Sequence, residues 1–123
     1  MHYVFVYGTL KRGGRLHSLL AEQEYVGCAE TRPHYRLFNC GSYPGLEEAA
    51  PGRSIQGEVY CVSTPVLKML DAAEGVDELL YERRRILLMP PHDDLLVEAW
   101  FYLQDSSSFP DCGSNWVNAT RAR

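Results

Sequence analysis

Short strand-like runs dominate this sequence, and only two segments have helical spacing. Because the chain lacks a regular alternation of strand, helix and parallel strand, a doubly wound fold is disfavoured. We therefore expect an α+β domain built on a small mixed, mainly antiparallel β-barrel with two or more short flanking helices. The expected strands, separated mostly by short turns, cover residues 3–7, 25–29, 35–38, 57–62, 81–89 and 97–103.

The two helical segments differ in how well their ends are marked. Leucines recur at helical spacing over residues 16–20 and predict one short helix. The second is delimited at both ends, since Ser63 can cap the first turn and Pro65 has the backbone angle that this turn needs. Gly75 follows the apolar face and predicts where this helix ends.

Two further stretches carry no regular pattern. Residues 40–57 are rich in proline and glycine, a composition that predicts a loop. A tail begins with a run of serines after residue 104, and Trp116 and Val117 are its candidates for packing onto the body. We therefore expect a single domain over residues 1–104, followed by a tail over 105–123 that is loosely structured or packed on the domain.

Charge and metal-ligand spacing exclude several classes of function. The formal net charge of −4 argues against a nucleic-acid surface, where clustered positive charge is expected. The four cysteines include no C-x-x-C pair, and the four histidines show no metal-ligand spacing. A disulfide framework and a metal site are therefore both disfavoured.

The N-terminus and the hydropathy of the chain bear on its location. Residues 1–6 enter a strand-like run directly and lack the basic region and cleavage site of a secretory signal. No segment approaches the ~20 apolar residues that span a bilayer. We therefore expect a cytoplasmic protein with no membrane partner.

A glycine-rich turn over residues 8–14 follows the first strand. Turns of this kind often bind anions, because exposed backbone N–H groups converge on an acidic group. The spacing of Gly8 and Gly13 is that of a phosphate-binding P-loop, but Gly14 and Arg15 stand where lysine and serine or threonine are required. Nucleotide binding is thus weakly indicated, and a plain tight turn remains the alternative.

The full amino-acid sequence of this turn is a more specific signal than the spacing of its glycines. Residues 4–13, VFVYGTLKRG, closely resemble the opening of the gamma-glutamylcyclotransferase-like family, in particular its gamma-glutamylamine cyclotransferase branch. Later landmarks follow in family order over about the first hundred residues: Tyr43-Pro44-Gly45, Gly57-Glu58-Val59-Tyr60, Leu70-Asp71-Ala72-Ala73-Glu74-Gly75, Tyr81-Glu82-Arg83-Arg84 and Ala99-Trp100-Phe101-Tyr102.

The resemblance implies a reaction and a site. It implies conversion of a γ-glutamyl amine or γ-glutamyl amino acid into 5-oxoproline and a free amine, with no cofactor and no metal. The backbone N–H groups of Gly8, Thr9 and Leu10 would bind the substrate's α-carboxylate. A glutamate just after the second helix would act as general acid/base, and by position it is Glu74.

The residues themselves favour Glu74 over other acids. It lies at the end of an apolar-faced helix, where the partial negative charge of the helix terminus raises a carboxyl pKa. Without the family context it reads as a solvated helix-end glutamate. Glu58 is the main competitor, but we expect it to pair with an arginine such as Arg84. Glu47 and Glu48 are expected to face water.

Three tyrosines are candidates for the pocket. Tyr7 and Tyr81 can each place a hydroxyl there, or else pack their rings in the core. Tyr43 belongs to a segment that forms either the cavity rim or a simple turn.

Other functions stay open at this point. A non-catalytic small-molecule-binding or interaction domain of the same fold is the main alternative, and a hydrolase or acyltransferase acting on another amide is a weaker one. The leaving amine is undetermined, and the oligomeric state is either monomer or homodimer.

Overall fold

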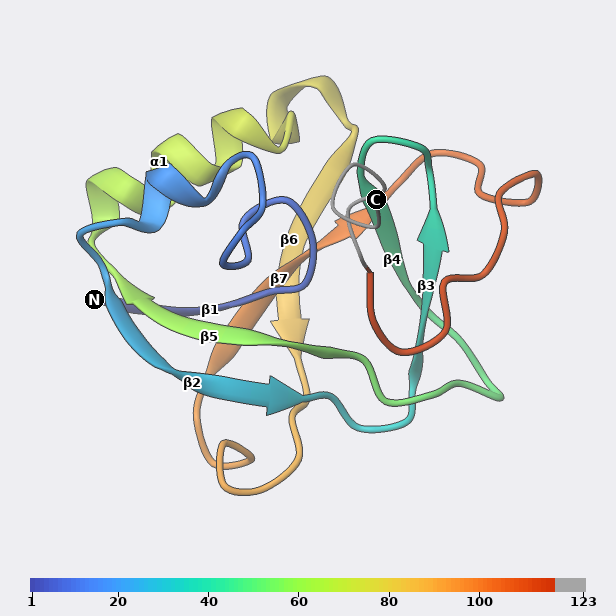
Figure 1. Cartoon of the computed structure of the whole chain (residues 1–123), viewed down its shortest axis with the longest axis horizontal. Helices are drawn as coiled ribbons and strands as arrows, with labels where there is room; N and C mark the ends of the chain where they lie inside the picture. Colours follow the sequence, from blue (N-terminus) through green and yellow to red (C-terminus); the bar gives the residue numbers. More distant parts are fainter. Residues whose placement is uncertain (117–123) are drawn as a thin grey trace.

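The computed structural model describes residues 1–116, which form seven strands, one α-helix and two short 3-10 helices (Figure 1). In chain order these are β1 (His2–Val6), η1 (His17–Leu20), β2 (Glu24–Glu30), β3 (Tyr35–Asn39), β4 (Pro44–Glu48), β5 (Gln56–Val62), α1 (Thr64–Ala73), η2 (Val76–Glu78), β6 (Tyr81–Ile86) and β7 (Val97–Tyr102).

Five of the strands form one mixed sheet in the order β2-β5-β1-β7-β6. β1 and β7 run parallel, and the other neighbours are antiparallel. This confirms the expected α+β class with a mainly antiparallel sheet. The edges β2 and β6 are linked by an isolated bridge between Thr31 and Leu88 just beyond the two strands. The strand order itself is that of an open sheet, so a fully closed barrel stays a prediction.

A separate hairpin of β3 and β4 lies beside this sheet, with β4 in contact with β7 (Figure 1). The pairing runs from Tyr35 opposite Glu48 to Asn39 opposite Pro44. The predicted loop over 40–57 is therefore wrong for residues 44–48. Pro44 is the first residue of its strand, where the missing N–H costs no ladder hydrogen bond.

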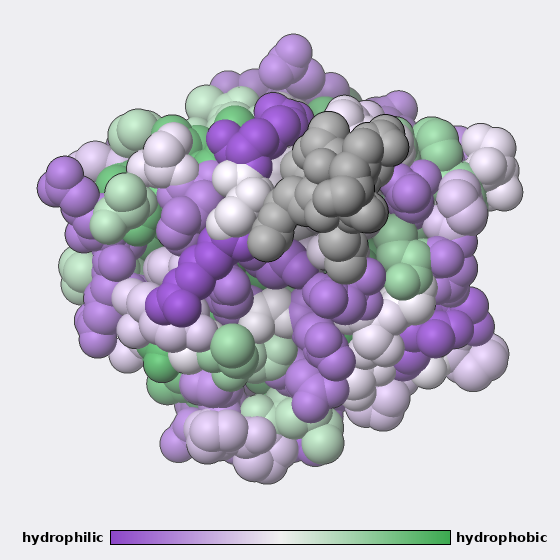
Figure 2. All heavy atoms as spheres, viewed as in Figure 1, coloured by the Kyte–Doolittle hydropathy of each residue, from purple (hydrophilic) through white to green (hydrophobic). Residues whose placement is uncertain are grey.

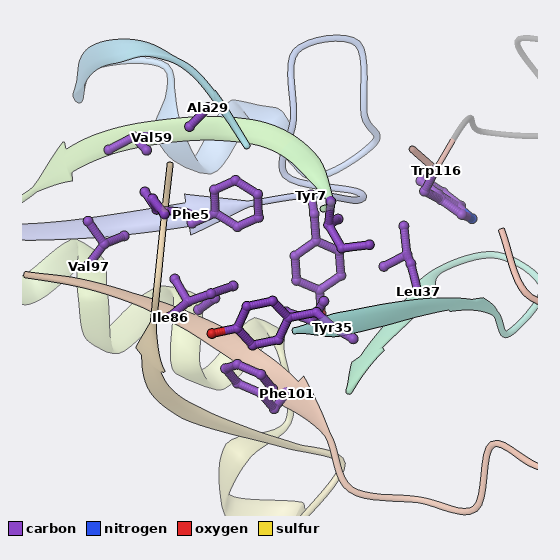
Figure 3. Close-up of a cluster of buried hydrophobic side chains, with 14 residues drawn as sticks. Phe5, Tyr7, Ala29, Tyr35, Leu37, Val59, Ile86, Val97, Phe101 and Trp116 are labelled. Atoms are coloured by element: carbon purple, nitrogen blue, oxygen red, sulfur yellow. The ribbon is translucent and has the colours of Figure 1, made fainter. Parts of the chain in front are cut away.

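Alternation along β1 divides the core in two. Phe5 and Tyr7 point to one face of the sheet and pack in the cluster of Figure 3, which also holds Phe101 and Trp116. Val4 and Val6 point to the other face, toward a second cluster. Leu67 and Leu70, the buried residues of α1, belong to that second cluster. The turn after β1 thus leaves the sheet where the two clusters meet.

Residues 110–116, which follow β7, pack back onto the β3–β4 hairpin. Backbone hydrogen bonds join Asn39 to Pro110 and Leu37 to Cys112, and the Trp116 side chain is buried in the first cluster. The expected packing of Trp116 is therefore observed. Val117 lies outside the described residues.

The surface drawn in Figure 2 is mostly hydrophilic, with apolar residues scattered over it. No helix among residues 1–116 combines the length and the apolar character that a membrane span requires.

Candidate active site

A small cavity of about 20 Å³ lies between the turn that follows β1 and the end of α1. Of its lining residues, only Tyr43 and Glu74 are partly exposed, so these two side chains form the mouth. All seven site residues predicted from the sequence are at this cavity, while the roles given to them remain predictions. The lining consists of Val6, Tyr7, Gly8, Thr9, Leu10, Tyr43, Pro44, Glu74, Tyr81 and Trp100.

The turn after β1 lines the cavity, and its backbone carbonyl and N–H groups differ in how they are bonded. Its carbonyl groups are occupied, because Gly8 O accepts from the Lys11 N–H at 3.0 Å and Thr9 O accepts from the Leu16 N–H at 2.9 Å. The Leu10 carbonyl accepts from the His17 ring Nδ1 at 2.9 Å. In contrast, the backbone N–H groups of Thr9 and Leu10 donate to no other group within residues 1–116. The turn therefore offers unused donors of the kind that bind a carboxylate.

Glu74 enters the cavity from the last turn of α1. The helix begins at Ser63, whose side chain accepts the Val66 N–H, and it ends where Gly75 takes a left-handed conformation with φ 66°. The Glu74 N–H still bonds to Leu70 O at 2.9 Å, so the residue is held by the helix backbone. Both predicted ends of this helix are confirmed.

The carboxyl group of Glu74 lacks a partner of its own. It accepts no hydrogen bond from any group within residues 1–116. Burial raises its pKa to about 7, and the positive charge of Arg15 offsets part of that rise. Near neutral pH the group is therefore divided between its protonated and ionised forms, as a residue that takes up and returns a proton requires.

Tyr7 and Tyr81 brace the cavity walls. The Tyr7 hydroxyl donates to Trp100 O at 2.5 Å, and the Tyr81 hydroxyl donates to Pro44 O at 2.5 Å. Burial, together with the nearby Glu74 carboxylate, raises the pKa of both phenols well above 10, so both keep their protons. Each ring lines the cavity while its hydroxyl proton is used by the main chain.

Tyr43 stands at the mouth, beside Tyr81. The two ring centroids are 6.3 Å apart in an edge-on arrangement. Cys40 N–H bonds to Tyr43 O at 3.0 Å, which closes the tight turn before β4. The segment is therefore both a turn and part of the rim.

The expected pairing of Glu58 with Arg84 is wrong. Glu58 Oε1 accepts from the Arg12 backbone N–H at 3.0 Å and from the Tyr60 hydroxyl at 3.1 Å. Arg84 instead pairs with Glu48 at 2.9 Å. β5 and β6 are separated in the sheet by β1 and β7, so their side chains do not meet.

Sequence reasoning missed two residues at this site, Trp100 and Asp71. Trp100 lines the cavity from β7, and the Asp71 carboxylate accepts its indole N–H at 2.9 Å. The available signal was spacing, because Asp71 precedes Glu74 by three positions on a helix and so lies on the same side of it.

Two observations bear on metal binding and on the thiols. Within residues 1–116 no group of three or more His, Cys, Asp or Glu side chains is placed to hold a metal ion. The four cysteines, all in this part of the chain, are unpaired thiols.

Comparison with known proteins places the chain in a family. Residues 4–118 match the family model described as "Gamma-glutamyl cyclotransferase, AIG2-like". A Vibrio cholerae protein provisionally named gamma-glutamylcyclotransferase is 40% identical over 83% of this chain and 81% of its own length. The human gamma-glutamylaminecyclotransferase is 37% identical over 68% of this chain and 59% of its own length.

A solved structure gives the same fold. The crystal structure of an AIG2-like protein from Mus musculus superposes with a TM-score of 0.81 at 24% identity, covering 99% of this chain and 92% of the mouse chain. Fold and sequence agree, and the chain belongs to the gamma-glutamyl cyclotransferase, AIG2-like family.

Proposed function

We propose that this protein is a cyclotransferase that converts a γ-glutamyl amine or γ-glutamyl amino acid into 5-oxoproline and a free amine. Glu74 is its general acid/base, and the turn at Gly8, Thr9 and Leu10 binds the substrate's α-carboxylate. The observation that carries the proposal is the convergence, on one cavity, of unused backbone donors with a carboxyl group that has no partner within residues 1–116 and a pKa near 7.

The reaction asks little of the protein beyond orientation and proton transfer. The substrate's α-amine attacks its own δ-carbonyl carbon, so a ring C–N bond forms and the bond to the leaving amine breaks. Glu74 takes a proton from the attacking nitrogen and returns it to the departing nitrogen, which balances the protons. Because nucleophile and carbonyl belong to one molecule, holding the chain folded supplies much of the rate enhancement.

The two ends of the cavity fit these two tasks. Thr9 and Leu10 are buried lining residues, and their N–H groups can fix the carboxylate of the γ-glutamyl group. Glu74 lies at the partly exposed mouth, where the leaving amine departs. We expect the proton carrier to lie between the reacting nitrogens and the solvent.

The cavity must widen when substrate binds. A space of about 20 Å³ holds one water molecule, whereas a γ-glutamyl group is several times larger. Tyr43 is the lining side chain best placed to move, since it is partly exposed and belongs to an exposed turn. We therefore expect the rim at Tyr43 to open during substrate entry.

The test is release of 5-oxoproline from a panel of γ-glutamyl amines, γ-glutamyl dipeptides and glutathione. We expect turnover by the wild type and a loss of at least ~10² in kcat with Glu74→Gln, which keeps the shape but cannot carry a proton. Glu22→Gln is the matched control, because Glu22 is an exposed acid far from Glu74 in the sequence, and this variant should retain full activity. A folded wild type that is silent across the panel would point instead to a binding domain of the same fold.

A further inference from the structure

A hydrogen-bonded network joins the helix that carries Glu74 to the wall of the cavity. Asp71 Oδ1 accepts the Trp100 indole N–H at 2.9 Å, and Asp71 Oδ2 pairs with Arg83 Nη1. Arg83 also donates through Nε to Glu98 Oε1 at 3.1 Å. A single carboxylate on α1 is thereby tied to both β6 and β7.

Trp100 connects this network directly to the site. Its side chain is buried and lines the cavity, and its backbone carbonyl accepts a hydrogen bond from the Tyr7 hydroxyl. Asp71 thus reaches the cavity along two routes. One runs through the Trp100 ring, and the other runs down the helix to Glu74, three residues later.

At its first residue, Thr64, α1 is also joined to β1 by a hydrogen bond with His2 at 2.9 Å. Toward the Glu74 end, the rest of its attachment is apolar, through Leu67 and Leu70. Apolar contacts are not directional, so they define the rotation and the axial position of a short helix less sharply than hydrogen bonds do. The bonds of Asp71 are directional, and they act on the same side of the helix as Glu74. The Glu74 carboxyl group has no bond of its own within residues 1–116, so its placement depends on the helix that carries it.

We propose that Asp71 is a positioning residue, which fixes the last turn of α1 against Trp100 and Arg83 and thereby aims the Glu74 carboxyl group into the cavity. Asp71 is not itself one of the residues that line the cavity, and it touches the lining through Trp100. Its role in turnover rests on the proposed function, whereas its effect on the surroundings of Glu74 does not.

The experiment compares Asp71→Ala, Asp71→Asn and the control Asp94→Asn, an exposed aspartate in the loop before β7. Asp71→Ala removes both bonds, and we expect kcat to fall about 10- to 100-fold with KM changed less than about threefold, because misplacing a proton carrier acts mainly on the chemical step. Asp71→Asn keeps an acceptor for the indole N–H and should retain more activity. Asp94→Asn should match the wild type.

A second readout needs no turnover. Titration of the Glu74 carboxyl by NMR should show its pKa falling from about 7 toward the ordinary glutamate value of about 4.3 in Asp71→Ala, because a loosened helix end admits water. The charged group that acts on the Glu74 pKa is Arg15, and the neighbouring phenols of Tyr7 and Tyr81 keep their protons. All three residues are unchanged in these variants. Asn and Ala remove the same charge, so a purely electrostatic effect would shift both variants equally.

Each outcome decides the matter. A folded Asp71→Ala protein with wild-type kcat and a wild-type Glu74 titration would overturn the positioning role, and so would equal pKa shifts in the Ala and Asn variants. If the Ala variant fails to fold, the Asn variant and its titration decide. If the wild type releases no 5-oxoproline at all, the proposed function fails, while the titration still tests what Asp71 does to Glu74.

Discussion

Gly8 and Pro44 lie so close together that a methyl group at position 8 would be 2.5 Å from the Pro44 Cγ atom. This contact joins the turn after β1 to the start of the β3–β4 hairpin. Because both residues line the cavity, the spacing between the two elements also sets the cavity's width at that point. Pro44 is buried, and the Tyr81 hydroxyl holds its carbonyl group, so the Pro44 side of the contact does not yield easily.

Gly8→Ala should therefore destabilise the fold and disturb the site together. We expect a loss of about 1–3 kcal/mol in the free energy of unfolding, the usual cost of overpacking a buried site. The added methyl group also pushes the Thr9 and Leu10 donors out of line, so KM should rise. Urea unfolding and steady-state kinetics on the same preparation measure both effects. Wild-type stability with wild-type KM would mean that the hairpin moves aside.

Tyr81→Phe tests whether the hydroxyl braces the rim. The substitution leaves Pro44 O without its donor, and we expect a loss of about 1–2 kcal/mol in the free energy of unfolding. A looser rim should raise KM more than it lowers kcat. Tyr25→Phe is a suitable control, since the Tyr25 hydroxyl bonds to the Cys28 thiol and Tyr25 does not line the cavity. A large drop in kcat alone would instead give the Tyr81 hydroxyl a direct part in the chemistry.

The pH dependence of turnover should report Glu74. The ionised carboxylate is the form that accepts the first proton, so kcat/KM should fall about tenfold per pH unit below a pKa of about 7. The residual activity of Glu74→Gln should lack this acidic limb. A limb that persists unchanged in the variant would belong to another group on the enzyme or to the substrate amine.

Local signals in the sequence were sufficient for the helix that carries Glu74. The helix start depends on Ser63 and Pro65, and its end depends on Gly75. Each of these residues affects the backbone only within one helical turn of its own position. The place of Glu74 at the end of this helix therefore followed from local signals, whereas its role as candidate acid/base came from the family resemblance. The turn after β1 was equally local, because a strand breaks there at Gly8.

Features that depend on distant parts of the chain were not predictable in this way. β4 was missed because Pro44 reads as a turn residue, and only its pairing with β3 makes it the start of a strand. The partner of Glu58 was missed because sheet order, which separates β5 from β6, is not written in the spacing of residues. The spacing of Asp71 from Glu74 was readable, but its partners were missed for the same reason, since Arg83 and Trp100 come from strands later in the chain.

Glu74 should lower the free energy of unfolding of the protein at neutral and higher pH. Its folded pKa of about 7 lies above the value of about 4.3 expected in the unfolded chain, so the folded state favours the neutral form. The contribution of the Glu74 carboxyl to the free energy of unfolding is fully present below about pH 4.3, where the group is neutral in both states. This contribution is lost as the pH rises through about 7. The loss is on the order of 2 kcal/mol, since the side chain is only partly buried.

Glu74→Gln removes this penalty, because the amide is neutral at every pH. The variant should unfold at the same urea concentration as the wild type near about pH 4, and it should be more stable by about 2 kcal/mol near about pH 8.5. Glu22→Gln, with its exposed side chain, should follow the wild type at both pH values. Equal stability of Glu74→Gln and wild type at the higher pH would mean that the Glu74 carboxylate is well solvated in the folded protein. In that case the group would titrate near its ordinary range, and its fitness as a proton carrier at neutral pH would be lost with it.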